Sequence, residues 1–107
     1  APVRTDERLI EQSYGIYEGQ DAETPGFLDN KHQFARRYPG GESMMQVAAR
    51  VYAFLDELKT RADLSAVLLV SHGGLCRVLN TYFEDIDNEA FFHWKMENTE
   101  IRHYTLK

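Results

Sequence analysis

A histidine and two glycines follow the longest apolar run of the sequence, and this order of residue types suits phosphate chemistry. Residues 66–70 are Ala, Val and Leu, and the next four are Ser71, His72, Gly73 and Gly74. Such a run predicts a strand buried on both faces, with functional groups at its carboxyl end. Glycines let the backbone approach a ligand, and the following helix offers its first N–H groups to an anion. We therefore expect a phosphate site at His72, although the same turn also occurs as a purely structural strand-to-helix connection.

Phosphoryl transfer at this turn needs a nucleophile, cations and an acid for the leaving alcohol. Glu11 is the candidate acid, at the start of a loop over residues 11–19. That loop holds Tyr14, Tyr17 and two glycines and has neither helical nor strand periodicity, which is typical of a functional loop. The two tyrosines are also consistent with a solvated turn that covers the edge of the core.

Apolar spacing predicts the elements that position these residues. Ser43 and Gln46 form a capping-box pattern before a helix that continues to about Arg61, the clearest helix in the sequence. The other expected elements are a short helix within 29–38, a helix over 73–83, a short helix capped by Asp87 or Asn88, and a closing strand over 101–106.

Composition restricts the class of protein. The 107 residues are the length of one domain, and 17 acidic against 12 basic residues argue against a nucleic-acid partner. The single cysteine, Cys76, excludes an internal disulfide and favours a reducing, cytoplasmic location. No apolar run is long enough for a membrane span, and four histidines without metal-ligand spacing argue against zinc. We expect no cofactor, no metal and no membrane partner.

Four motifs occur along the chain in an order that is typical of one enzyme family. They are the Leu-x-Glu-x-x-x-Gly-x-x-Glu-Gly pattern over residues 9–19, Pro-Gly-Gly-Glu-Ser at 39–43, Leu-Leu-Val-Ser-His-Gly-Gly at 68–74 and Glu-Asn-Thr at 97–99. With them, the chain resembles the histidine phosphatase superfamily, also called the phosphoglycerate mutase-like family. The resemblance implies an α/β fold, a three-layer sandwich in which helices flank a mostly parallel central sheet. It also implies that residues 1–107 are a single domain, the C-terminal portion of the family's domain, so that the sandwich is incomplete.

The resemblance assigns roles to four residues. His72 corresponds to the second active-site histidine, which binds and polarises the phosphoryl group without being the nucleophile. Gly73 would offer its N–H to the phosphate. Glu11 corresponds to the general acid that later acts as base for water, and Tyr14 lies where relatives contact substrate. The implied reaction passes a phosphoryl group to a histidine and then to water, without metal.

The Arg-His-Gly motif that carries the family's nucleophilic histidine does not occur in the sequence. We therefore expect the chain alone to be inactive and its full-length parent to hydrolyse a small phosphomonoester through a phosphohistidine. The alternatives are phosphoglycerate mutase activity, or a non-catalytic module that binds a phosphorylated ligand or a protein.

A missing first strand has a consequence for partners. In the family that strand lies beside the one that corresponds to residues 66–70, so its absence would expose an apolar edge. We expect this edge to be covered by a second copy in a homodimer or by the missing N-terminal segment.

Overall fold

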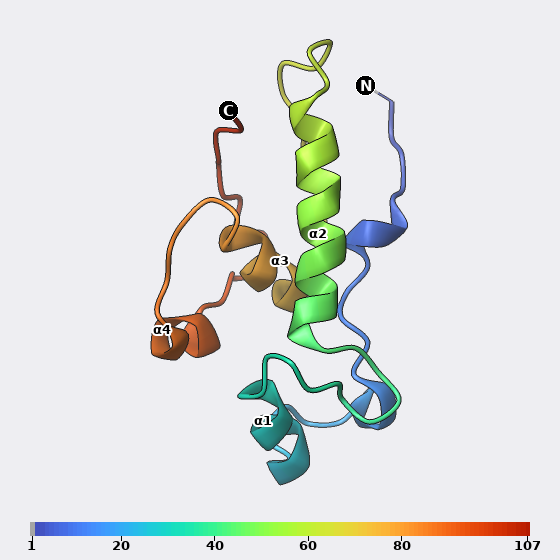
Figure 1. Ribbon diagram of the computed structural model, residues 1–107, viewed down its shortest axis with the longest axis vertical. Coiled ribbons are helices and arrows are strands. Elements are labelled where there is room, and N and C mark those ends of the chain that lie inside the picture. Colours follow the sequence, from blue (N-terminus) through green and yellow to red (C-terminus); the bar gives the residue numbers. More distant parts are fainter. Residues whose placement is uncertain (1) are drawn as a thin grey trace.

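The computed structural model describes residues 2–107 as helices joined by extended and irregular segments (Figure 1). The longest helix, α2 (Met44–Lys59), runs along the long axis of the molecule, and α3 (Gly73–Asn80) packs against it. The shorter helices α1 (Pro25–Lys31) and α4 (Asn88–His93) lie at one end and at one side of this pair. Within residues 2–107, no helix has the length and apolar character that a membrane crossing requires.

Helix α2 begins as its sequence predicts. The Ser43 hydroxyl accepts a hydrogen bond from the Gln46 N–H at 3.1 Å, and the Gln46 side chain accepts one from the Ser43 N–H at 2.9 Å. This reciprocal pair satisfies two N–H groups that a helix start leaves without partners. The predicted capping box is therefore confirmed, and the helix ends at Lys59, close to the expected end.

The core lies between α2 and α3. Val47, Val51 and Leu75 are fully buried, and each such side chain contributes about 1.5–3 kcal/mol relative to an exposed one. The remaining buried members of this apolar cluster are Met44, Leu55, Val78, Leu79 and Phe91. Since the cluster includes the first turn of α3, it also fixes the turn that precedes that helix.

Two of the short helices differ from their predicted ranges. Helix α1 starts at Pro25, before the expected range 29–38. Proline suits the first helical turn, because the N–H group that it lacks would make no hydrogen bond within the helix there. Helix α3 ends at Asn80, after which residues 81–83 continue only as turns. The predicted cap of α4 is confirmed, since the Asp87 carboxylate accepts a hydrogen bond from the Ala90 N–H at 2.8 Å.

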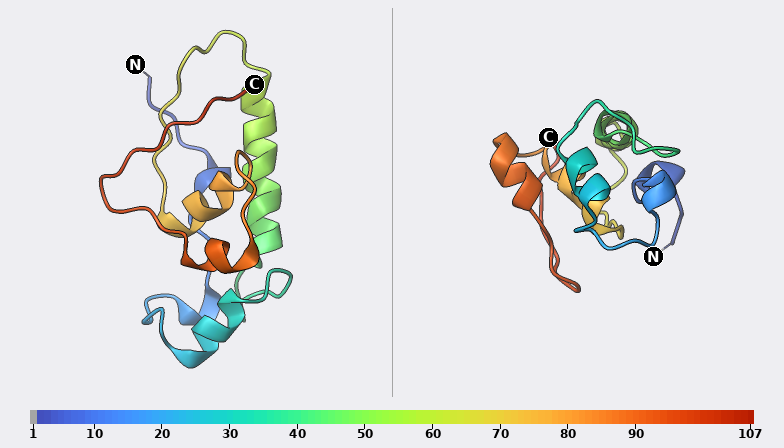
Figure 2. Two further views of the ribbon diagram at one scale, coloured as in Figure 1. Left: turned by 90° about the vertical axis from the view of Figure 1, so that its left-hand side faces the viewer. Right: turned by 90° about the horizontal axis from the view of Figure 1, so that it is seen from below.

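The expected three-layer sandwich with a mostly parallel sheet is wrong for this structure, because none of residues 2–107 forms a strand. Residues 66–70 are extended, but Leu68 and Val70 are 74% and 82% exposed rather than buried on both faces. In Figure 2 this connection between α2 and α3 is an open trace without an arrow. Residues 101–106, the predicted closing strand, likewise make no backbone hydrogen bond with any other part of residues 2–107. A strand requires a neighbour that takes up its N–H and C=O groups, and no segment among the described residues does so.

Candidate active site

The structure brings Glu11 to the N-terminus of α3, as the predicted site requires. Its two carboxylate oxygens accept hydrogen bonds from the Gly74 N–H at 3.1 Å and the Leu75 N–H at 2.8 Å, although these residues are more than 60 positions away. The Gln12 N–H also donates to this carboxylate, at 2.9 Å. A negative charge is stabilised at a helix N-terminus by the free N–H groups and the helix dipole. The Glu11 carboxylate therefore caps the N-terminus of α3.

A second hydrogen bond holds the same two segments together on the other side of His72. The Ser71 hydroxyl donates to the Leu9 carbonyl oxygen at 2.7 Å. With the Glu11 carboxylate bound just after His72, the turn is fixed to the Glu11 loop at both ends. His72 itself takes the N-cap position of α3 and is exposed, and its carbonyl accepts from the Cys76 N–H at 2.9 Å.

Gly73 provides the amide that remains for a ligand. Of the first four N–H groups of α3, those of Gly74 and Leu75 bind Glu11 and that of Cys76 binds His72. The Gly73 N–H has no acceptor within residues 2–107, and a side chain at this position would meet open space. An exposed imidazole beside a free helix amide can bind an anion. Among the first four N–H groups of α3, the Gly73 N–H is therefore the one left without an acceptor in residues 2–107.

Tyr14 lies against the same turn. A Cβ atom on Gly74 would be 2.6 Å from the Tyr14 hydroxyl and 2.8 Å from Glu11 Oε1, so a larger residue at this position would displace both side chains. Burial raises the pKa of Tyr14, and the negative charge of Glu11 raises it further. The phenol therefore stays protonated and can donate a hydrogen bond to a ligand oxygen.

Hydrogen bonds to residues 39–42 hold the Glu11 loop in place. The Glu42 carboxylate accepts from the Ser13 N–H at 2.9 Å and binds the Arg50 guanidinium through two bonds of 3.0 Å. Burial by itself raises the pKa of Glu42, but the hydrogen bonds from Arg50 and Ser13 outweigh it, and the pKa lies below its usual value. Arg50 also donates to the Arg8 carbonyl at 2.8 Å, so the same ion pair holds the segment just before the loop.

Sequence reasoning missed one charged residue near this site. Arg77 is only 6% exposed, and burial lowers its pKa, while the charges of Tyr14, Tyr38 and Glu11 oppose that shift. The available signal was its spacing, because a residue four positions after Gly73 lies one helical turn along the same face.

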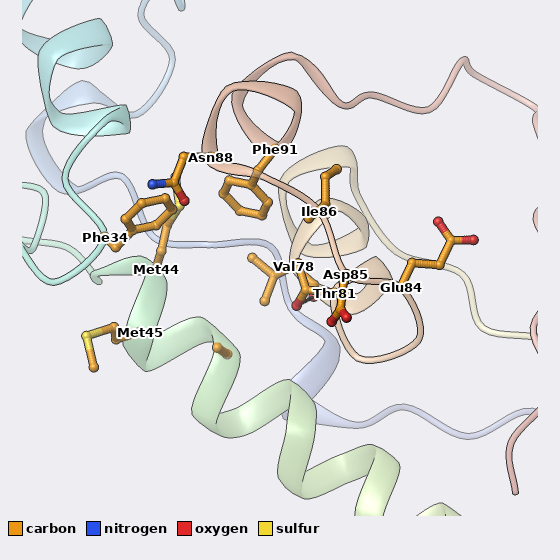
Figure 3. A pocket seen from close by; sticks show the side chains of 11 residues that line it. Phe34, Met44, Met45, Val78, Thr81, Glu84, Asp85, Ile86, Asn88 and Phe91 are labelled. Atoms are coloured by element: carbon orange, nitrogen blue, oxygen red, sulfur yellow. Dashed lines mark hydrogen bonds between the residues drawn. The ribbon is translucent and has the colours of Figure 1, made fainter.

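Two hollows lie outside the turn itself. One, of about 290 Å³, is walled by apolar side chains of α2, α3 and α4, with Glu84 and Asp85 among its lining (Figure 3). Neither Glu11 nor His72 contributes to it. The other, of about 430 Å³, is lined in part by Glu11, Glu42 and Arg50 and so adjoins the site. Across residues 2–107, no three His, Cys, Asp or Glu side chains gather closely enough to hold a metal ion.

Comparison with known proteins identifies the family of the chain. The family model of the histidine phosphatase superfamily (branch 1) matches residues 1–107. A curated protein of Hydrogenobacter thermophilus (strain DSM 6534 / IAM 12695 / TK-6), named "Putative phosphoserine phosphatase 2", is 31% identical over 103 residues, which cover 90% of this chain and 50% of that protein. The chain thus spans about half the length of that relative, and no solved structure matches it. The chain belongs to the histidine phosphatase superfamily, branch 1.

Proposed function

We propose that this chain supplies part of a phosphoryl-transfer site that hydrolyses small phosphomonoesters. The observation that carries the proposal is the capping of α3 by Glu11, which sets a carboxyl group beside the exposed His72 and the free Gly73 N–H. An acid, an imidazole and a backbone donor at one helix end are the groups that protonate a leaving alcohol and stabilise a phosphoryl group.

The proposed reaction has two steps. The phosphoryl group passes from the ester oxygen to the nitrogen of a nucleophilic histidine, and the leaving alcohol takes the proton of Glu11. Water then attacks the phosphohistidine, Glu11 accepts a proton of that water, and inorganic phosphate leaves. His72, the Gly73 N–H and Tyr14 bind the phosphoryl oxygens and the substrate in both steps, and no metal takes part.

We propose hydrolysis rather than mutase activity, because the name of the Hydrogenobacter relative describes a phosphatase. Because Arg-His-Gly does not occur in these 107 residues, we propose that another segment supplies the nucleophilic histidine and that the chain by itself is inactive.

The test is reconstitution with a family segment that carries Arg-His-Gly, either fused upstream or added as a second polypeptide. We expect hydrolysis of p-nitrophenyl phosphate and a base-stable, acid-labile phosphorylated histidine in the assembly, and neither in this chain alone. The same assembly with His72→Ala should lose about 10²- to 10³-fold in kcat/KM, as when one stabilising donor is removed. If the reconstituted assembly folds and forms no phosphohistidine, the proposal is wrong, and binding of a phosphorylated ligand without turnover would then favour the non-catalytic module.

We further propose that another polypeptide covers the extended segment over residues 66–70. Val67, Leu68 and Val70 are 46%, 74% and 82% exposed there, and an open apolar backbone segment is a template for pairing with another chain. For the isolated chain we expect a second copy to take this place, with a dimer mass in light scattering. Leu68→Lys should shift the chain to monomer, whereas Ile16→Lys, at a side chain 62% exposed elsewhere, should leave the dimer intact. A monomer at high concentration with protected amides over 66–70 would contradict the proposal.

A further inference from the structure

Four aromatic side chains form a cluster of their own around Tyr14. The centre of the Tyr14 ring lies 4.9 Å from that of Phe27 and 5.2 Å from that of Tyr38. Phe27 and Tyr38 also pack on each other at 5.3 Å, and Tyr17 lies 5.5 Å from Phe27. Within residues 2–107, the apolar cluster between α2 and α3 includes none of these four rings. They are therefore a second, smaller cluster, which lies at the candidate active site.

Tyr38 is the fixed member of this cluster. Its side chain is 1% exposed, and its backbone N–H donates a hydrogen bond to the Glu42 carbonyl oxygen at 3.3 Å. The Glu42 N–H in turn donates to the Ser13 carbonyl oxygen at 2.9 Å, so the segment of Tyr38 is bound directly to the residue before Tyr14. The edge-to-face contact of the two rings, at an angle of 89°, is thus supported by backbone hydrogen bonds.

Phe27 brings α1 into contact with the Glu11 loop. The helix lies beside this loop in both Figure 1 and Figure 2. The residue before Phe27 is Gly26, and a Cβ atom there would overlap the Tyr17 hydroxyl, so the start of α1 packs closely on the loop. The close approach sets the Phe27 ring against Tyr14 on one side while Tyr38 contacts it on another.

Packing, and not a hydrogen bond, places the Tyr14 hydroxyl over the turn at Gly74. Among residues 2–107 the hydroxyl has no hydrogen-bond partner, and the residue is held instead through its backbone N–H, which donates to the Glu18 carboxylate at 2.6 Å. A tyrosine without such a partner can rotate about two side-chain bonds unless its neighbours prevent it. The direction of the hydroxyl therefore depends on the rings that contact Tyr14.

We propose that Phe27 and Tyr38 are positioning residues, which hold the Tyr14 ring so that its hydroxyl stays in place to bind a phosphate oxygen. The inference rests on the proposed function, in which Tyr14 binds the phosphorylated ligand. A hydrogen bond weakens steeply when its angle departs from linearity, so a fixed ring gives a stronger bond than a mobile one. A ring that is already fixed also loses little rotational freedom when the ligand binds. Loss of either supporting ring should therefore weaken binding, and should do so only through the Tyr14 hydroxyl.

A double-mutant cycle on the 107-residue chain tests this dependence, with inorganic phosphate as the probe. Its affinity is measured by NMR titration of the Gly73 and Gly74 amides. We expect Tyr14→Phe to weaken binding about tenfold or more, because it removes a hydrogen bond to a charged group. Phe27→Leu should weaken binding about threefold to tenfold in the chain with Tyr14, the cost of ordering one side chain. In the Tyr14→Phe background the same change should have no effect, whereas a general disturbance of the site would weaken binding in both backgrounds.

Tyr38 allows a rescue experiment with a conservative variant. Tyr38→Phe keeps the ring that contacts Tyr14 and should keep the phosphate affinity of the unmodified chain. Tyr38→Leu removes the ring and should weaken binding at least as much as Phe27→Leu, because Tyr38 is the more deeply buried of the two. If this substitution prevents folding, Phe27→Leu still decides the question, since Phe27 is half-buried and outside the core.

Phe92→Leu is the matched control, and the cycle separates the possible outcomes. Phe92 is also half-buried, but it packs on Phe34 at 5.5 Å and not on Tyr14, so the affinity for phosphate should not change. An equal effect of Phe27→Leu in both backgrounds, or none in either, would overturn the positioning role and leave the proposed function in place. An unchanged affinity in Tyr14→Phe would do the same. No phosphate binding by the unmodified chain would contradict the proposed phosphate site, and the positioning role with it.

Discussion

Replacement of Glu11 by glutamine should lower the rate of hydrolysis of alkyl phosphates by about 10²- to 10⁴-fold in the assembly that contains the phosphorylatable histidine. Two physical effects act together. Glutamine carries no proton that it can give to the leaving alcohol. It also offers one oxygen where the carboxylate offers two, so its NH₂ group would face the Gly74 or Leu75 N–H that now donates to Glu11.

The dependence on the leaving group tells these effects apart. The p-nitrophenolate ion leaves without a proton, so Glu11→Gln should reduce hydrolysis of p-nitrophenyl phosphate much less than hydrolysis of glycerol 3-phosphate. Glu23→Gln, the same change at an exposed carboxylate before α1, should affect neither rate. An equal loss for both esters would indicate that Glu11 only caps α3 and does not act as the acid.

Gly15→Ala should destabilise the chain by at least about 3 kcal/mol, because two separate penalties coincide at this position. Gly15 has a φ of +57°, which disfavours any residue with a Cβ atom. That Cβ would also overlap the Pro39 carbonyl oxygen, which now accepts a hydrogen bond from the Ile16 N–H at 2.9 Å. Since this contact holds the Glu11 loop against residues 39–42, its loss should also weaken ligand binding. Unfolding in urea measures the change.

Gly19→Ala is the matched control for this prediction. Gly19 has a φ of +76°, but a Cβ there would meet nothing within 4 Å, so only the backbone penalty of about 1–2 kcal/mol applies. The difference between the two variants therefore isolates the contact with Pro39. Equal destabilisation of both variants would show that this contact does not hold the loop.

The sequence predicted elements whose signals lie within a few residues. The capping box of Ser43 and Gln46 and the Asp87 cap are confirmed, because each is satisfied within one helical turn of its own helix. The family was also accessible from the order of the motifs, which the match over residues 1–107 supports. The prediction for residues 66–70 was wrong, since a strand depends on a partner elsewhere and its apolar pattern does not reveal whether that partner is present.

The same distinction between local signals and contacts of distant segments applies to the site. The sequence by itself identified His72, Gly73, Glu11 and Tyr14 as candidates, through residue type, spacing and resemblance to a family. Only the tertiary structure decided that the Glu11 carboxylate caps α3 and leaves one amide, that of Gly73, for a ligand. The burial of Arg77 was likewise decided by the packing of segments distant in sequence. The physical reason is that hydrogen-bond partners and burial across tens of residues depend on how the whole chain packs, which local periodicity does not encode.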